Sequence, residues 1–201
     1  MEFLSALKER IPDYAKDVRL NLDAVIARSS LDKADALGAA LAAAYAARSK
    51  AIVDAIRNSG ELDETDTQAA LSAAALMGMN NVWYPYVEMA RDEDLRTQRA
   101  ELRMNAYATH GGVDKKRFEL FSLAASIVGK CHFCVASHYK MLKENGVTAQ
   151  QLRDVGRIAA VVTAASNVIA RASPLRTRRS ASNGCATSAA RRPASSSGVS
   201  P

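Results

Sequence analysis

"RFELFSLAASIVGKCHFCVASH", residues 117–138, is the stretch that decides the fold of this chain. Its first part spaces apolar residues as a helix does, and its second part brings Cys131, Cys134 and His138 within eight positions. Each residue of a helix advances about 100°, so these three side chains would share one narrow face. A helix that begins near Cys131 also favours a thiolate there, because the amides of its first turn are unpaired. The stretch therefore predicts two successive helices with two neighbouring thiols at the start of the second.

Glu119 is the acidic residue of the first of these helices and lies twelve residues before Cys131. Its neighbours are large and apolar, which predicts that this helix is largely buried. A buried carboxylate needs a partner, and His138 is the candidate. A positioned imidazole can take the proton of Cys134 as a general base. The sequence thus predicts a relay from Glu119 through His138 to Cys134.

The remainder of the chain also reads as helix, and the predicted fold class is all-α. The predicted helices cover residues 12–29, 30–60, 69–78, 92–107, 114–128, 131–144 and 148–171. Ser30 is expected to cap the second of them, and Thr148 with Gln151 the last. Gly78 and Pro85 are expected to bracket a break. We find no alternating run that indicates a strand.

A faint internal repeat appears when residues 71–83 are placed on residues 123–134, which puts Gly78 on Gly129. The repeat predicts two weakly similar halves, of which the first keeps the scaffold without the chemistry. Alanine-rich helices match one another easily, so chance similarity is the alternative interpretation.

The chain divides by composition at about residue 172. The last thirty-one residues contain six arginines and no acid, and without them the chain has 21 basic and 21 acidic residues. A neutral body argues against a nucleic-acid-binding protein. Residues 173–201 are rich in Ser, Ala, Arg and Pro and are predicted to be a disordered tail after a single domain over residues 1–172. The tail reads either as a binding arm or as the product of a misread coding frame, in which case Cys185 is incidental.

The chain is expected to be soluble and cytoplasmic, without contact to a membrane. It contains no uninterrupted run of roughly 18 apolar residues, and its N-terminus lacks the order of a secretory signal. Cytosolic proteins seldom use disulfides as structural staples, so a close cysteine pair there is more often catalytic or metal-binding. Zinc held by Cys131, Cys134, His138 and Glu119 is the metal-binding alternative.

The pattern E-x11-C-x2-C-x3-H, with "GKCHFCVASH" after a "LAASIVG" helix, resembles the alkyl hydroperoxidase D (AhpD) family of the carboxymuconolactone decarboxylase-like superfamily. The likeness extends over roughly residues 1–170 and includes the helix order and the "NVWYPY" segment. It implies an all-α, AhpD-like helical fold and an oligomer, often a homotrimer. It also implies a thiol-dependent antioxidant that reduces alkyl hydroperoxides or a partner peroxiredoxin, AhpC. Electrons would come from dihydrolipoamide on a lipoylated protein, with no tightly bound cofactor.

The resemblance also implies a role for each site residue. Cys134 would be the peroxidatic thiol that becomes a sulfenic acid. Cys131 would be the resolving thiol and proton donor, closing a Cys131–Cys134 disulfide. Glu119 and His138 would form the proton relay.

This chain departs from the family pattern beside the second cysteine. Many relatives have a histidine immediately before it, where this chain has Phe133, and His132 follows the first cysteine instead. A one-residue step turns a side chain by about 100°, so His132 is expected to be structural or exposed. Trp83, Tyr84 and Tyr86 are predicted to be core or subunit-interface aromatics, with substrate contact as the alternative.

Two other classes of function fit parts of the pattern. One is a superfamily decarboxylase acting on a lactone acid, for which the cysteines would be dispensable. The other is a zinc-stabilised helical interaction module. Within the thiol interpretation, the motif does not separate a direct peroxidase from an adaptor that reduces a peroxiredoxin.

Overall fold

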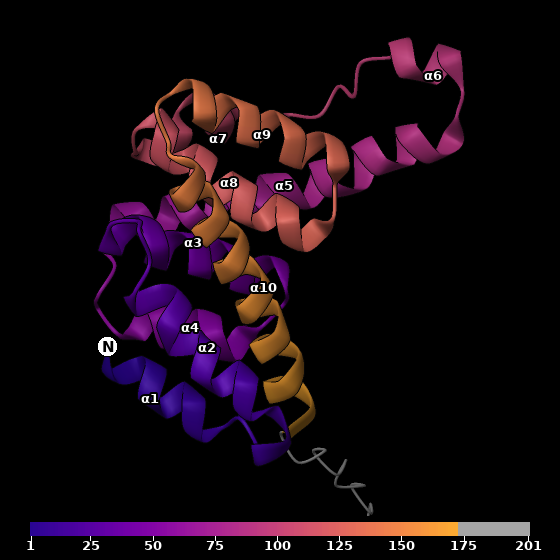
Figure 1. The fold of residues 1–201 in the computed structure, drawn as a ribbon. Helices are drawn as coiled ribbons and strands as arrows, with labels where there is room; N and C mark the ends of the chain where they lie inside the picture. The colour runs from indigo at the N-terminus through magenta and orange to yellow at the C-terminus, as the bar shows by residue number, and fades with distance from the viewer. Residues whose placement is uncertain (173–201) are drawn as a thin grey trace, which may run out of the picture.

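The computed structural model describes residues 1–172, which form ten α-helices and two short 3-10 helices without any strand in that range (Figure 1). The α-helices are α1 (Glu2–Glu9), α2 (Lys16–Ala27), α3 (Lys33–Ala46), α4 (Lys50–Asn58), α5 (Glu64–Ala90), α6 (Glu93–Thr97), α7 (Asn105–Ala108), α8 (Lys115–Gly129), α9 (His132–Glu144) and α10 (Ala149–Ala172). The 3-10 helices are η1 (Asp13–Ala15) and η2 (His110–Gly112). The all-α prediction is confirmed. The predicted tail, residues 173–201 with Cys185, lies outside the described residues.

Helix α8 is the central element of the core and contacts α3, α5, α9 and α10. Every residue from 118 to 126 of this helix is buried. It packs closely on the alanine-rich α3, where a Cβ atom on Gly38 would lie only 2.2 Å from the ring of Phe121. The absence of a side chain at Gly38 therefore lets the two central helices approach each other.

The single helix predicted over residues 30–60 is in fact two helices, α3 and α4. The chain breaks at Arg48, whose φ of +59° lies in the left-handed region. Arg48 donates its N–H to the carbonyl of Tyr45 at 2.9 Å, and Ser49 donates to Ala44 at 2.9 Å. These two bonds end α3 with a left-handed residue, a position that glycine usually occupies. Because an arginine holds this position, the sequence carries no glycine signal for the break.

Ser30 does not cap α3, contrary to the prediction. The cap is Asp32, whose carboxylate accepts the N–H of Asp35 at 2.8 Å. Ser30 instead donates its N–H at 2.9 Å and its hydroxyl at 2.8 Å to one oxygen of Asp154 on α10. Burial alone would raise the pKa of Asp154, but these bonds and those from two arginines of α10 hold that pKa well below its usual range. Ser30 thus ties the start of α3 to α10.

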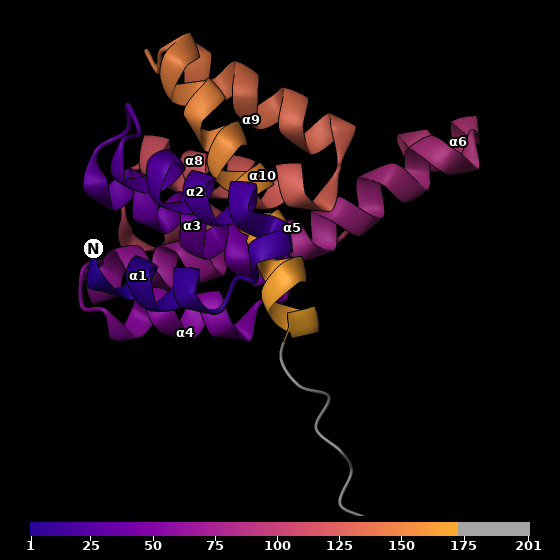
Figure 2. The ribbon, with the colours of Figure 1, turned by 60° about the horizontal axis from the view of Figure 1, so that its bottom comes forward.

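Helix α5 runs unbroken through Gly78 and Pro85, so the break predicted there is wrong. Proline removes one intrahelical hydrogen bond, but the first half of α5 is anchored in the core by buried alanines and Met77. The second half leaves the body of the molecule and, with α6, forms a projecting arm (Figures 1 and 2).

The helix predicted over residues 92–107 is interrupted. Residues 98–104 are not helical and lead from α6 back to α7, with Glu101 in the left-handed region at a φ of +51°. We call residues 98–104 the strap. The remaining predicted helices agree with α8, α9 and α10 within a few residues, and Thr148 and Gln151 form the expected capping box at 3.0 to 3.2 Å.

Helices α3, α4 and α5 repeat the arrangement of α8, α9 and α10. Both first helices start at an aspartate cap, Asp32 or Asp114, and end at a left-handed basic residue, Arg48 or Lys130. A glycine with positive φ ends each second helix: Gly60 and Gly146. Within residues 1–172, these two three-helix units therefore share their start and end signals.

The register of this repeat differs from the predicted one. Residues 71–83 lie inside the continuous α5, whereas residues 123–134 span the junction of α8 and α9. When Arg48 is placed on Lys130, the buried residues Leu37, Ile52 and Ile56 fall on the positions of Glu119, Cys134 and His138. The first unit therefore keeps the helical scaffold but has apolar residues at the positions of the candidate site residues.

Helix α10 has the length and composition of a membrane span, which the sequence analysis did not anticipate. In the structure its apolar face packs against α2, α3 and α8. Buried residues recur along that face at helical spacing: Leu152, Val155, Ile158, Val162 and Ile169. Through this face, α10 forms part of the helical core of the described residues.

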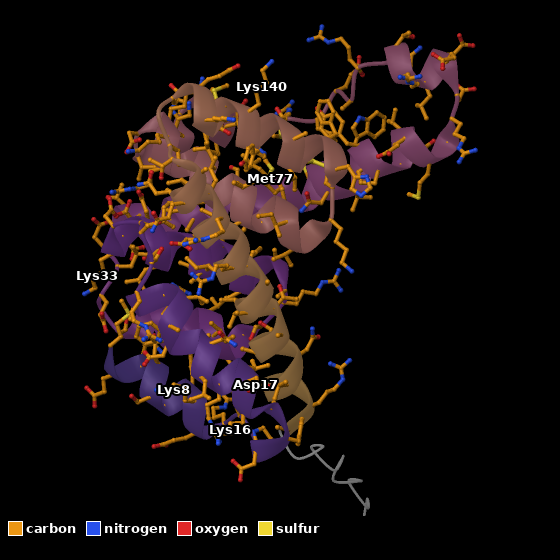
Figure 3. The ribbon with its side chains drawn as sticks, viewed as in Figure 1. Lys8, Lys16, Asp17, Lys33, Met77 and Lys140 are labelled. Carbon is orange, nitrogen blue, oxygen red and sulfur yellow. A yellow bond between two sulfur atoms is a disulfide. The ribbon has the colours of Figure 1, made fainter. Side chains whose placement is uncertain are left out.

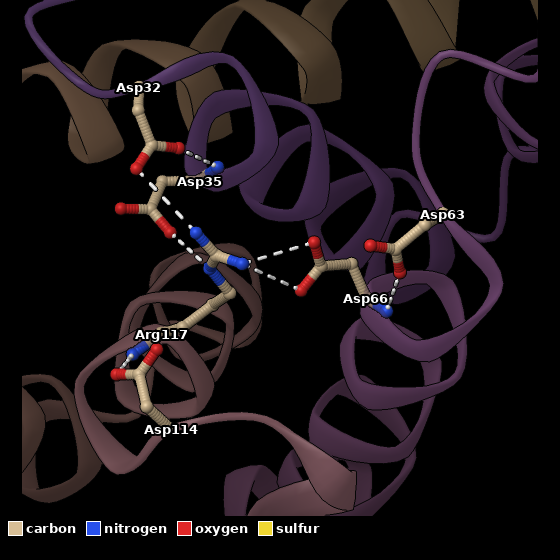
Figure 4. Close-up of polar contacts among 6 residues, drawn as sticks. All are labelled: Asp32, Asp35, Asp63, Asp66, Asp114 and Arg117. Atoms are coloured by element: carbon tan, nitrogen blue, oxygen red, sulfur yellow. Dashed lines mark hydrogen bonds and ion pairs between the residues drawn. The ribbon is translucent and has the colours of Figure 1, made fainter.

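An arginine joins the starts of α3, α5 and α8 (Figure 4). Arg117 Nε lies 2.8 Å from Asp35 Oδ1, and Nη1 lies 3.1 Å from each carboxylate oxygen of Asp66. Asp35 and Asp66 are only 4% and 3% exposed. Burial raises the pKa of Asp35, and the hydrogen bond from Arg117 opposes that rise. Two buried carboxylates thus depend on one guanidinium.

We predict that Arg117→Met lowers the free energy of unfolding by about 3 kcal/mol or more, because it leaves two buried carboxylates without their cation. Urea unfolding followed by circular dichroism measures this change. Arg96→Met is the control, since its ion pair with Glu93 is exposed and should contribute less than about 1 kcal/mol. Equal losses in the two variants would contradict this view of the cluster.

Candidate active site

Cys131 and Cys134 are joined by a disulfide bond at the start of α9, with their Cα atoms 5.3 Å apart. Cys131 is the N-cap of the helix, and its sulfur accepts the backbone N–H of Cys134 at 3.2 Å. The two residues are 0% and 3% exposed. The sulfurs therefore lie where a helix start favours negative charge, and they are shielded from bulk water.

The turn before α9 explains this placement. Lys130 has a φ of +56° and ends α8 with its N–H bonded to the carbonyl of Ile127 at 3.1 Å. Cys131 then donates to the carbonyl of Ser126 at 3.4 Å and adopts an extended conformation. The chain reverses at this point, so α9 returns along α8.

The reversal brings His138 of α9 onto Glu119 of α8. Nδ1 of His138 lies 2.6 Å from Oε2 of Glu119, and both side chains are buried. An ionised carboxylate only accepts hydrogen bonds, so Nδ1 carries the proton and donates it. The structure thus pairs the two residues that the sequence analysis expected to meet.

Tyr107 is a member of the site that the sequence analysis missed. Its hydroxyl donates to Oε1 of Glu119 at 2.5 Å. Burial alone would raise the pKa of Glu119, but the hydrogen bonds from His138 and Tyr107 outweigh it and lower that pKa. Burial and the bond to Glu119 raise the pKa of Tyr107 above its ordinary value. Glu119 is therefore held as a carboxylate by two donors.

Met77 is the second missed member and is labelled in Figure 3. It lies fully buried on α5, and its sulfur is 3.2 Å from Nε2 of His138. With its proton on Nδ1, the neutral imidazole has no proton on Nε2 to donate, so Met77 positions the ring by packing against it. The imidazole is therefore held from both sides, by Glu119 and by Met77.

A cavity of about 240 Å³ opens onto the second cysteine. Its lining residues come from α5, α7, α9 and the end of the strap: Asn80, Tyr84, Met104, Tyr107, Phe133, Cys134, Ser137 and His138. Cys131 is not among them, so Cys134 is the sulfur that faces the cavity. The site combines a cavity-facing sulfur with a histidine on the same wall.

A second cavity, of about 500 Å³, adjoins the first beneath the strap. The two cavities share Asn80, Tyr84 and Met104, and the outer one adds Arg99 and Glu101. The strap and α5 therefore line both cavities.

The aromatic residues near the motif divide between the cavity and the arm. Tyr84 stacks on Phe133 with ring centroids 4.3 Å apart, and both line the inner cavity. Trp83 and Tyr86 contact each other on the arm at 5.8 Å. His132 is exposed, as expected, and its Nδ1 lies 3.8 Å from a carboxylate oxygen of Glu88 on the arm.

Within residues 1–172 the structure shows no group of three or more His, Cys, Asp or Glu side chains that could hold a metal ion. The two sulfurs of the zinc alternative are bonded to each other. The two nitrogens of His138 face Glu119 and Met77. The four proposed ligands therefore do not converge on an ion position.

Comparison with known proteins places this fold and site in a family. A sequence model of the Carboxymuconolactone decarboxylase family matches residues 93–177. The alkyl hydroperoxide reductase AhpD of Rhodospirillum centenum is 44% identical over 168 residues, which cover 83% of this chain and 90% of that protein. The AhpD of Coxiella burnetii strain Dugway is 39% identical over 170 residues (82% and 96%), and that of Rhodopseudomonas palustris strain BisA53 is 43% identical over 161 residues (79% and 88%).

The fold and the site define an all-helical protein with a Cys-x-x-Cys disulfide beside a buried Glu–His pair. The chain belongs to the family of alkyl hydroperoxide reductase AhpD. The resemblance noted in the sequence is therefore confirmed.

We predict that Glu119→Gln flattens the dependence of stability on pH in acid. The folded pKa of Glu119 lies below the ordinary glutamate value of about 4.3. The ionised form therefore stabilises the fold above that value, and this contribution is lost as the pH falls through the folded pKa. Denaturant unfolding of the oxidised protein between pH 7 and acid should show a steeper loss in the wild type. Parallel curves for the two proteins would contradict the assignment.

Proposed function

We propose that this protein is a thiol-dependent alkyl hydroperoxide reductase that cycles between the Cys131–Cys134 dithiol and disulfide. The observation that carries the proposal is the disulfide at the start of α9, with Cys134 facing a cavity that His138 also lines. The names of the AhpD relatives support the same reaction.

In the oxidative half-reaction, the Cys134 thiolate attacks the terminal oxygen of the hydroperoxide. The sulfur–oxygen bond forms as the oxygen–oxygen bond breaks, leaving a sulfenic acid on Cys134. The departing alkoxide takes up a proton and leaves as the alcohol. His138, held by Glu119 on the same cavity wall, would move that proton through Nε2, the nitrogen that faces Met77 in the oxidised structure.

Cys131 then completes the oxidation. The Cys131 thiol attacks the Cys134 sulfenic acid, its proton joins the departing hydroxyl group to give water, and the Cys131–Cys134 disulfide closes. The N–H of Cys134, which lies 3.2 Å from the Cys131 sulfur, would stabilise the thiolate form of Cys131 in the reduced protein. The oxidised arrangement of the structure corresponds to the end of this step.

In the reductive half-reaction, a donor dithiol reopens the bond. A donor thiolate attacks Cys134, the sulfur that faces the cavity, and Cys131 leaves as a thiolate at the helix start. The second donor thiol then displaces Cys134 and forms the donor disulfide. We propose protein-bound dihydrolipoamide as the donor, because its dithiol lies at the end of a long flexible arm that could pass beneath the strap.

The same dithiol could reduce the disulfide of a partner peroxiredoxin, AhpC, in the cytoplasm. Turnover of hydroperoxide measured with and without that partner separates the direct role from the adaptor role. Alkylation of the thiols separates both from a decarboxylase, whose activity on a lactone acid would survive it.

We propose that the chain forms a homotrimer through the arm. The arm exposes large apolar side chains that a monomer would leave in water: Val82, Tyr86 and Met89 are 69%, 49% and 74% exposed. Apolar groups gathered on one projecting element favour self-association.

We predict that Cys134→Ser abolishes the reduction of tert-butyl hydroperoxide by dihydrolipoamide, because it removes the attacking sulfur. Alcohol release and dithiol consumption measure the activity. Cys185→Ser is the matched control and should keep wild-type turnover. Mass spectrometry of the oxidised wild type should find a loss of two hydrogens joining Cys131 and Cys134. Substantial turnover by Cys134→Ser would refute the proposal.

We predict that the double variant Val82→Glu, Met89→Glu dissociates the oligomer, because buried glutamates at an apolar contact would have no partners. Light scattering after size-exclusion chromatography gives the mass. Leu20→Glu changes an exposed apolar residue of α2, away from the arm, and should leave the mass unchanged. A trimer that survives the arm substitutions would place the interface elsewhere.

A further inference from the structure

Tyr107 binds the carboxylate oxygen of Glu119 that His138 does not contact. Oε2 of Glu119 accepts from His138 at 2.6 Å, and Oε1 accepts from the Tyr107 hydroxyl at 2.5 Å. The two donors come from α9 and α7, on different sides of the carboxylate. With both oxygens bound, the carboxyl plane cannot rotate without breaking a charge-assisted hydrogen bond.

The position of Tyr107 is itself fixed by packing. Its ring meets Phe118 edge to face, with centroids 5.9 Å apart and an interplanar angle of 77°. Its backbone N–H is bonded to the carbonyl of Met104 at 2.9 Å. Phe118 is fully buried on α8, next to Glu119 in the sequence. The helix that carries the carboxylate thus also positions the tyrosine that binds it.

Tyr107 also lines the inner cavity with Cys134 and His138, so its hydroxyl could in principle serve the substrate. A phenol has only one proton to donate, and here that proton is committed to Glu119. Donation to a peroxide oxygen would break the bond to the carboxylate. The geometry therefore favours a role through Glu119 over direct contact with the reacting atoms.

We propose that Tyr107 is a positioning residue for the peroxidase reaction, which fixes the Glu119 carboxylate in the orientation that holds His138 beside Cys134. This inference rests on the proposed function of the Cys131–Cys134 pair. It adds a fourth residue type, a phenol, to the proton-handling part of the site.

Removal of the hydroxyl has a defined electrostatic consequence. Glu119 faces His138 of α9, Tyr107 of α7 and Lys115 of its own helix, and Tyr84 of α5 acts on Tyr107. Burial raises the pKa of Glu119, and the bonds from His138 and Tyr107 lower it. Without the Tyr107 bond only His138 opposes burial, so the pKa of Glu119 rises. A protonated Glu119 no longer offers His138 a charged acceptor, and activity should therefore be lost at a higher pH.

The test is Tyr107→Phe, which removes only the hydroxyl and keeps the ring on Phe118. We expect kcat for tert-butyl hydroperoxide with dihydrolipoamide to fall about tenfold or more, as for loss of a hydrogen bond to a charged group, with KM little changed. The acid limb of the kcat profile should move to higher pH. Tyr139→Phe, an exposed tyrosine of α9 outside the cavity, is the matched control and should leave both unchanged.

A double-mutant cycle with Glu119→Gln tests whether Tyr107 acts through the carboxylate. In the Glu119→Gln background, Tyr107→Phe should cause a much smaller fall in kcat than in the wild type. Any of three results would overturn the inference. Tyr107→Phe could keep the wild-type kcat and pH profile, it could change KM alone, or it could lower kcat as much in the Glu119→Gln background as in the wild type. Cys134→Ser is assayed in parallel. If Cys134→Ser is inactive and Tyr107→Phe behaves like the wild type, only this inference is rejected. If Cys134→Ser is active, the proposed function is rejected.

Discussion

The left-handed turn at Lys130 is the constraint on which the rest of the site depends. A non-glycine residue in this conformation costs about 1 kcal/mol, and the fold retains it because α8 and α9 must pack against each other on either side. The turn ends α8, leaves Cys131 as the N-cap of α9 and directs α9 back along α8. That return brings His138 to Glu119, so one backbone conformation positions both the disulfide and the Glu119–His138 pair.

The buried carboxylates of the Arg117 and Glu119 clusters are each surrounded by hydrogen-bond donors or opposite charge. Arg117 binds two buried aspartates, and Glu119 binds His138 and Tyr107, so each buried ion has opposite charge or donors around it. The Arg117 cluster consists of a guanidinium and carboxylates, and it joins the starts of three helices. The Glu119 cluster contains a histidine, so an arrangement of the same kind can also move a proton.

The repeat of three helices separates what the scaffold requires from what the chemistry requires. Both units use an aspartate cap, a left-handed basic residue and a second helix that buries one face, but Ile52 and Ile56 stand in the first unit where Cys134 and His138 stand in the second. The first unit still contributes to the site, because its last helix, α5, supplies Met77 and Tyr84. The site is therefore built between the units, with its reactive groups on the second.

Sequence alone determined the all-α class, the last three helices and the register of Cys131, Cys134 and His138, because helix periodicity, caps and i to i+4 spacing are local. It also indicated Glu119, since a lone acid among large apolar residues needs a partner. Only the tertiary structure decided the break at Arg48, the unbroken course of α5 through Pro85, and the parts played by Tyr107 and Met77. Met77 lies 61 positions from His138, and Tyr107 reaches Glu119 because the strap folds back on the body. Such contacts depend on how packed helices meet, which no local pattern records.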